Sequence, residues 1–134
     1  MNGIQHSAVR SSVGEKLWID NEYTISSLPT YLKGASWLFQ VPSWIDQYAT
    51  ISITSPKPAT LFIATNDITF IRNQKNQGFD NFKGTVSYNR GPEADKGSFT
   101  IIFAKSLSAN QPFQFRTQNA GLNNLAIFLS LGIF

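Results

Sequence analysis

Few side chains in this sequence can carry acid–base, nucleophilic or metal chemistry. The only histidine is His6, and there is no cysteine. A zinc site takes three or four nitrogen, sulfur or carboxylate ligands, and a Ser-His-Asp triad needs a histidine as its base. Because His6 lies in a polar N-terminal stretch ahead of the predicted core, we predict no zinc site, no catalytic triad and no thiol chemistry.

The carboxylates are spread along the chain rather than gathered in a motif. They are Glu15, Asp20, Glu22, Asp46, Asp67, Asp80, Glu93 and Asp95. A glycosidase needs two carboxylates facing each other across a cleft, whereas these eight fall in predicted loops or near strand ends. The oxygens of residues 20–22 and 66–67 have the chemistry of calcium ligands, but turn formation explains them better. We therefore predict no enzyme activity, no cofactor and no bound metal.

Three tryptophans remain as candidates, because exposed rings flanked by amides form stacking surfaces for sugars. Trp18 and Trp37 lie in alternating, strand-like stretches, which predicts that both belong to the core. Trp44 follows Pro42 in a predicted loop, where it is either exposed for binding or folded back over the edge of the core. The candidate binding residues are Trp44, Asp46, Tyr48, Asn66 and Asp67.

The composition indicates one globular domain with an amide-rich surface. The 134 residues are 42% hydrophobic and only 14% charged, with 11 Asn and 8 Gln. The net charge is +3, but the lysines and arginines are scattered, which argues against nucleic acid as a partner. No apolar run approaches the length of about 18 residues that a membrane helix needs, so no membrane partner is predicted. Because the N-terminus lacks a signal-peptide pattern, an intracellular protein is favoured, with a mature secreted chain as the alternative.

Short strand-like stretches separated by turn signals occur from residue 17 onward. They cover residues 17–19, 23–25, 35–41, 50–54, 59–65, 82–88, 98–107, 113–116 and 125–131. No stretch has the period of a long amphipathic helix, and Pro56 and Pro58 mark a turn. The sequence predicts an all-β fold, an antiparallel β-sandwich of jelly-roll type. Residues 1–14 are expected to be a polar N-terminal arm, and residues 15–134 a single domain.

A compact corner is predicted at residues 28–33. Pro29 fixes φ and Gly34 permits a positive φ, so at most one short helical turn fits between them. Three large side chains at i, i+3 and i+4 spacing face the core together, namely Leu28, Tyr31 and Leu32. The predicted structural corner consists of Tyr23, Pro29, Leu32 and Gly34.

The same region resembles a jelly-roll-like β-sandwich accessory module that is often appended to secreted bacterial enzymes. Asp20, Tyr23-Thr24 and the Pro-x-x-Leu-x-Gly-Ala pattern at 29–35 resemble its opening, and 57–64 and 98–110 resemble later strands. The resemblance covers roughly residues 17–131 and implies a non-catalytic accessory or interaction domain, sometimes presumed to bind carbohydrate. The chain departs from it at Val41-Pro42-Ser43-Trp44-Ile45-Asp46, where such modules often carry an Asn/Asp-rich loop.

Two functions follow from these observations. The first is a non-catalytic interaction module, a structural component that docks into a larger protein assembly through the N-terminal arm and the loops at 41–48, 72–81, 89–97 and 117–124. The alternative is a lectin-like carbohydrate-binding module, in which Trp44 and the neighbouring amides contact a glycan.

Overall fold

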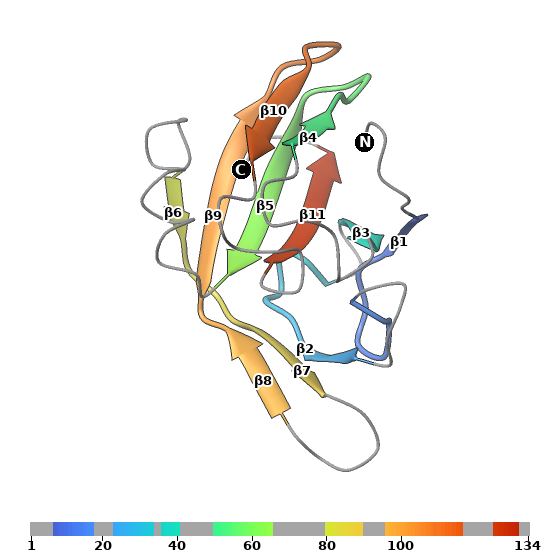
Figure 1. Cartoon of the computed structure of the whole chain (residues 1–134), viewed down its shortest axis with the longest axis vertical. Helices are drawn as coiled ribbons and strands as arrows, with labels where there is room; N and C mark the ends of the chain where they lie inside the picture. The colour runs from blue at the N-terminus through green and yellow to red at the C-terminus, as the bar shows by residue number, and fades with distance from the viewer. Residues whose placement is uncertain are drawn as a thin grey trace.

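The chain is all-β and antiparallel, as the sequence predicts. In the computed structural model, the described residues are 7–17, 23–33, 36–40, 50–65, 80–89, 96–116 and 125–131. Within these ranges there are eleven strands and no helix (Figure 1). The strands form one large sheet and two smaller ones, which together make a β-sandwich. The jelly-roll connectivity stays a prediction.

The main sheet has six strands in the order β1-β3-β11-β5-β9-β6. Their bounds are Ser7–Arg10 for β1, Trp37–Gln40 for β3, Leu125–Leu131 for β11, Ala59–Thr65 for β5, Ile101–Leu107 for β9 and Asp80–Phe82 for β6. Each neighbouring pair is antiparallel. All of β5 is buried, so both faces of the sheet are covered at its centre. This explains why the centre of β5, Leu61-Phe62-Ile63-Ala64, is continuously apolar instead of alternating.

Two smaller sheets complete the sandwich. One consists of β2 (Thr24–Ser27), β7 (Val86–Asn89) and β8 (Lys96–Phe99), and the other is a ribbon of β4 (Thr50–Ile53) and β10 (Phe113–Arg116). The ribbon lies over one face of the main sheet, where the Lys105 ammonium is 5.7 Å from the centre of the Phe113 ring. We call this side the ribbon face.

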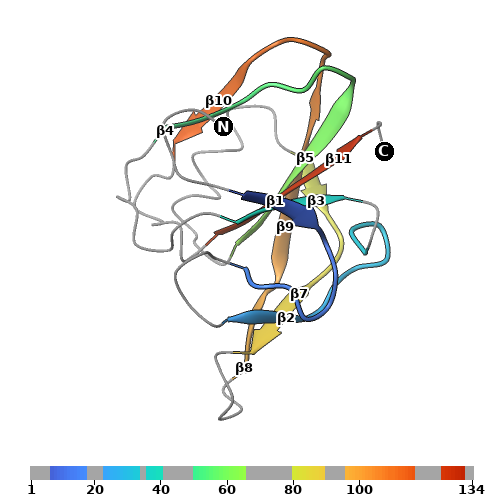
Figure 2. The same ribbon diagram turned by 90° about the vertical axis from the view of Figure 1, so that its right-hand side faces the viewer.

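The corner at residues 28–33 packs on the opposite side of the main sheet, which we call the corner face (Figure 2). The ring of Tyr31 is 5.3 Å from that of Phe62 on β5, and Leu28 and Leu32 are buried. The amide of Lys33 donates to the Pro29 carbonyl at 3.2 Å and closes one turn, within the limit of at most one short helical turn that the sequence predicts. Gly34 lies outside the described residues.

The main sheet passes into the ribbon through two turns that run side by side. Ala59 pairs with Leu107 in the main sheet, and Ile53 pairs with Phe113 in the ribbon. The intervening turns, 54–58 and 108–112, are joined by a hydrogen bond of 2.7 Å that the Asn110 amide donates to the Ser55 carbonyl. Asn110 has a φ of 61°, a left-handed conformation that asparagine tolerates better than most residues. The turn predicted at the two prolines is confirmed.

The other end of the main sheet passes into the three-stranded sheet through a β-bulge. Phe82 pairs with Ile102, and Val86 pairs with Phe99. Three residues, 83–85, therefore lie opposite two, 100–101, and such a mismatch bends and twists a ribbon. The sequence predicts one strand over 82–88 and one over 98–107. Both are broken at this bulge because the chain leaves one sheet and enters another.

The N-terminal segment joins two sheets. It is predicted as a polar arm, but Ser7–Arg10 forms β1 at the edge of the main sheet. Further along, the Gly14 amide donates to the Ile25 carbonyl at 2.8 Å and the Leu17 amide to the Tyr23 carbonyl at 2.9 Å. The stretch Ser-Ala-Val-Arg gives no strand signal in the sequence, because it contains only one large apolar side chain.

Candidate interaction edge

The outer side of β1 is an edge of the main sheet at which the register fixes the direction of the backbone groups. The Ser11 amide donates to the Ser36 carbonyl at 3.0 Å, so these two residues form a hydrogen-bonded pair directly after β1. Such pairs alternate with non-hydrogen-bonded ones along an antiparallel ladder. By this alternation, Val9 directs its N–H and C=O toward β3, and Ala8 and Arg10 direct theirs away from it.

Within the part of the chain that the structure describes, no strand pairs with that outer side of β1. Edge strands of this kind present unpaired N–H and C=O groups that can template another strand. Natural proteins blunt such edges with short strands and charged residues, and β1 has four residues ending in Arg10. The outer side of β1 can therefore pair with another strand, but the positive charge of Arg10 restricts which segments can do so.

Arg10 packs on an aromatic ring of the neighbouring strand. Its guanidinium carbon lies 4.2 Å from the centre of the Trp37 ring. Residues of a non-hydrogen-bonded pair have the shorter Cα separation, which brings the two side chains together. A cation–π contact at an exposed site contributes about 0.5–1 kcal/mol. The prediction that Trp37 belongs to the core is wrong: Trp37 is half-buried, and Leu38 is the β3 residue that is fully buried.

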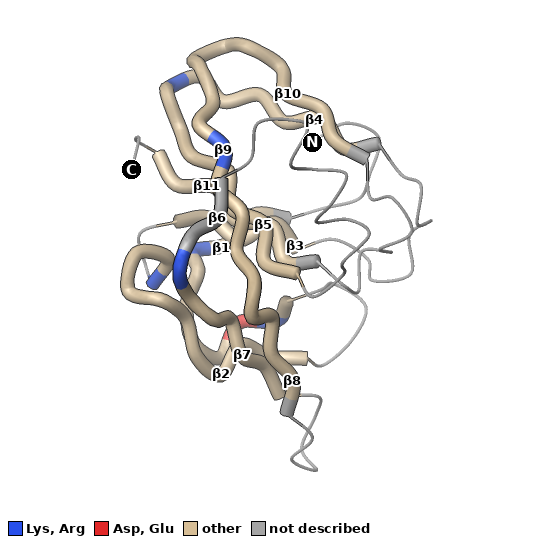
Figure 3. The backbone as a smooth tube through the Cα atoms, turned by 90° about the vertical axis from the view of Figure 1, so that its left-hand side faces the viewer, with Lys and Arg blue, Asp and Glu red and all other residues tan. Residues whose placement is uncertain are grey.

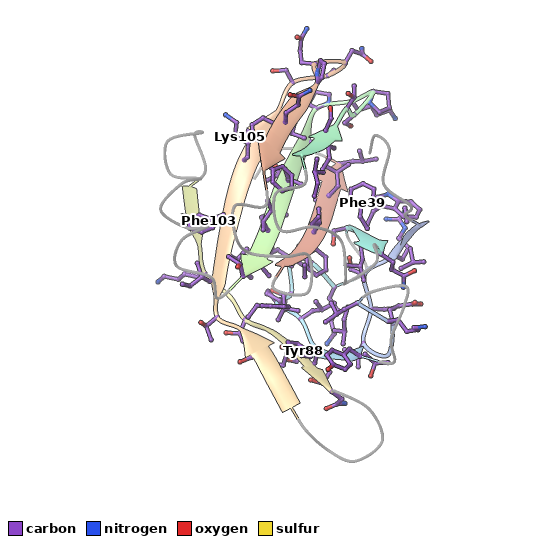
Figure 4. All side chains as sticks on the ribbon, in the orientation of Figure 1. Phe39, Tyr88, Phe103 and Lys105 are labelled. Atoms are coloured by element: carbon purple, nitrogen blue, oxygen red, sulfur yellow. The ribbon has the colours of Figure 1, made fainter. Side chains whose placement is uncertain are left out.

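Arg10 and Trp37 begin a row of directly paired side chains across the ribbon face. The row runs through Arg10, Trp37, Leu129, Leu61 and Lys105. Its middle is buried and apolar, and each end carries a cation over an aromatic ring. Figure 4 labels Lys105 on β9 and Phe39 on β3, toward opposite edges of the main sheet. The β1 end of the row is the more exposed of the two, because Arg10 is exposed and Lys105 is half-buried.

Two buried hydroxyls fix the end of β1 to the corner. The Ser36 hydroxyl donates to the Leu32 carbonyl at 2.9 Å. The oxygens of Ser11 and Ser36 are 2.8 Å apart. Because the single proton of the Ser36 hydroxyl goes to Leu32, the Ser11 hydroxyl donates to Ser36. Both serines are buried, so this chain of hydrogen bonds holds β1 in register against β3.

The side chains that the structure describes carry mostly positive charge. The cationic ones are Arg10, Lys16, Lys33, Lys57, Lys83 and Lys105, and Glu15 is the one anionic side chain among them. Figure 3 shows basic positions spread over several strands and turns rather than gathered in one patch. The net charge of the whole chain is +3, and a net positive charge favours association with acidic partners over basic ones.

Tyr31 has the one clearly perturbed pKa among the described side chains. Burial raises the pKa of its hydroxyl to about 12. The hydroxyl donates a hydrogen bond of 2.8 Å to the Lys83 carbonyl, next to the β-bulge. A phenol that holds its proton so firmly is no general base at neutral pH. Its contacts indicate that it fastens the corner to the bulge.

The residues predicted for binding are Trp44, Asp46, Tyr48, Asn66 and Asp67, and all five lie outside the described residues. Of the predicted corner, Tyr23, Pro29 and Leu32 are described, and Leu32 is fully buried. The edge of β1 was not predicted. A sequence signal for it is weak, because the direction of a backbone amide depends on the pairing register and not on the residue type.

Two kinds of feature are absent from the described ranges. No group of three or more His, Cys, Asp or Glu residues comes together there to hold a metal ion. The same ranges contain no helix that is long and apolar enough to cross a membrane.

Comparison of the chain with protein-family models, with curated proteins and with solved structures finds no match. The resemblance to the accessory module therefore stays a prediction.

Proposed function

We propose that the chain is a non-catalytic β-sandwich interaction domain that docks into a larger protein assembly, as a structural component, through the outer edge of β1. The observation that carries this proposal is the outward direction of the backbone groups of Ala8 and Arg10, beside the cation–π pair of Arg10 and Trp37. Addition of a strand to a sheet edge is a common mode of peptide recognition, in which main-chain hydrogen bonds supply affinity.

The edge is well suited to docking because hydrogen bonds hold β1 in register on the sheet. The buried hydroxyls of Ser11 and Ser36 hold β1 against the sheet, and residues 14–17 bond to 23–25 of the second sheet. A partner strand that adds to β1 therefore pairs with a strand that is already in register, which reduces the conformational-entropy cost of binding.

Proline substitutions at two adjacent positions test the proposal. Ala8→Pro removes an N–H that points outward, and proline is tolerated on edge strands where the N–H faces away from the ladder. Ala8→Ser keeps that N–H and is the matched control. The chain is cross-linked to its partners, isolated with them and examined by native mass spectrometry. Defined complexes are expected for the Ala8→Ser variant, and these complexes are expected to be lost for Ala8→Pro. Complexes of equal yield with both variants would refute docking at this edge.

Val9→Pro is the second control. Because Val9 directs its N–H toward β3, this variant is expected to lose β1 pairing and to unfold at a lower urea concentration than Ala8→Pro. The comparison separates loss of docking from loss of the fold.

A glycan in place of a protein partner is the alternative outcome. Affinity electrophoresis against a panel of polysaccharides, with Trp44→Ala as the control, tests it. Two results together would favour carbohydrate binding over protein docking. The chain would be retarded by a polysaccharide in a way that Trp44→Ala abolishes, and it would be monomeric in native mass spectrometry.

A further inference from the structure

We infer that the partner segment at β1 is an extended strand that places an acidic side chain opposite Arg10 and an apolar side chain opposite Val9. This inference rests on the proposed function and names the chemistry of the partner. It follows from the two faces of β1: Ala8 and Arg10 lie on the ribbon face, and Val9 lies on the corner face beside the buried Leu38.

The acidic position follows from the setting of Arg10. Paired residues of neighbouring strands share a face of the sheet, so the residue opposite Arg10 lies on the ribbon face. The guanidinium of Arg10 lies over the Trp37 ring, on the side toward β3. This contact restricts the positions that the guanidinium can take. A carboxylate on the added strand can accept hydrogen bonds from the guanidinium, and such charge-assisted bonds are stronger than neutral ones.

The apolar position follows from the setting of Val9. Its side chain is half-buried and packs against the core. An apolar residue opposite Val9 would cover the part of this side chain that is still exposed and extend the core by one strand. A charged residue there would lie against an apolar surface. The expected pattern is an acidic residue next to an apolar one, with either chain direction giving the same faces.

The net charge of the chain favours the same partner. It is +3 at neutral pH, which favours an acidic segment over a basic one. A basic residue opposite Arg10 would repel it, because like charges directly opposite on neighbouring strands destabilise a sheet.

The backbone direction is measured first, by hydrogen exchange of the free protein in nuclear magnetic resonance. The amides of Val9 and Ser11 are expected to exchange slowly, and those of Ala8 and Arg10 quickly, because only the former are bonded to β3. Slow exchange of Ala8 and Arg10 in the free protein would mean that another segment of this chain covers the edge. That result would overturn both this inference and the proposed function.

The partner chemistry is measured next, with two short synthetic peptides of alternating Thr and Val. One carries a central Glu and the other a central Lys in its place. The Glu peptide is expected to bind about fivefold tighter than the Lys peptide, since it replaces a repulsive cross-strand pair by an attractive one, and to slow exchange at Ala8 and Arg10. In the Arg10→Glu variant the preference is expected to reverse, which excludes a general effect of net charge.

Equal binding of the two peptides, or binding that leaves the Ala8 and Arg10 amides unchanged, would overturn the inferred partner chemistry. If Ala8→Pro still abolishes the complexes in native mass spectrometry in that case, docking at the edge stands. Only the inferred chemistry of the added strand is then wrong. The two failures are thus distinguishable.

Discussion

The ring of Tyr88 lies directly over Gly97 of the neighbouring strand. The two residues are cross-strand partners in β7 and β8, and a Cβ built on Gly97 would stand 2.5 Å from the Tyr88 Cζ. The ring is held in place, because it stacks on Tyr23 at 6.0 Å and lies 5.2 Å from the ring of Phe99. We therefore expect Gly97→Ala to lower the free energy of unfolding by about 1–3 kcal/mol, measured by urea denaturation.

The Tyr88→Leu variant is the control for this effect. With the ring removed, Gly97→Ala should cost much less, because the added methyl group no longer meets it. Equal costs in the two backgrounds would show that the contact between Tyr88 and Gly97 is not the cause.

Gly84 in the β-bulge allows a comparison of crowding with backbone strain. Its φ is 150°, and a Cβ there would lie 2.6 Å from Pro29 Cγ and 2.8 Å from the Tyr31 hydroxyl. Gly14 also has a positive φ, of 96°, but a Cβ there meets nothing within 4 Å. We expect Gly14→Ala to cost about 1 kcal/mol from strain alone, and Gly84→Ala to cost at least about 2 kcal/mol from strain and crowding together. Chemical denaturation ranks the two, and the reverse order would contradict the crowded geometry at the bulge.

The two buried serines should differ in their contributions. Ser36→Ala removes the group that both donates to Leu32 and accepts from Ser11, leaving two buried polar groups without this partner. Its expected cost is about 1–3 kcal/mol, and that of Ser11→Ala about 1 kcal/mol. The double variant removes both hydroxyls, so its cost should be less than the sum of the single ones. Simple additivity in urea denaturation would count against the proposed chain of hydrogen bonds.

Tyr31 gives the fold a dependence on alkaline pH. The pKa of its hydroxyl rises from 10.0 to about 12 through burial, so the folded state retains the proton that the unfolded chain loses above pH 10. Where the folded state binds more protons than the unfolded state, the free energy of unfolding falls as the pH rises. The stability contribution is thus complete below about pH 10 and is lost as the pH rises toward 12.

Tyr31→Phe isolates this effect from the titration of the lysines. Guanidinium denaturation at several pH values between neutral and alkaline is expected to show a steeper loss of stability for the wild-type chain than for the variant. Parallel curves would mean that the Tyr31 hydroxyl titrates alike in the folded and unfolded states.

Much of the strand layout could be predicted from the sequence. The stretches predicted at 59–65, 113–116 and 125–131 coincide with β5, β10 and β11, because their apolar content or alternation is distinctive. The corner was also predictable, since Pro29 and the spacing of Leu28 and Leu32 act locally. Pairing order was not predictable in the same way: it depends on contacts between residues far apart in the chain.

The outer edge of β1 shows most clearly which features could not be predicted from the sequence. Ser11 and Ser36 are 25 residues apart, and nothing in either sequence context indicates that their hydroxyls meet. The role of Arg10 depends on its pairing with Trp37, which the alternation of β3 placed in the core. The five residues predicted for ligand contact, Trp44, Asp46, Tyr48, Asn66 and Asp67, stay a prediction.

The position of β11 in the main sheet has a consequence for biosynthesis. β11 lies between β3 and β5, so it is the only strand of the order β1-β3-β11-β5-β9-β6 that connects the first two strands to the last three. A ribosome-bound chain that has not yet released residues 125–131 holds two incomplete half-sheets with unpaired inner edges, and such edges expose a growing chain to aggregation. The main sheet can therefore be completed only after almost all of the described residues have been synthesised.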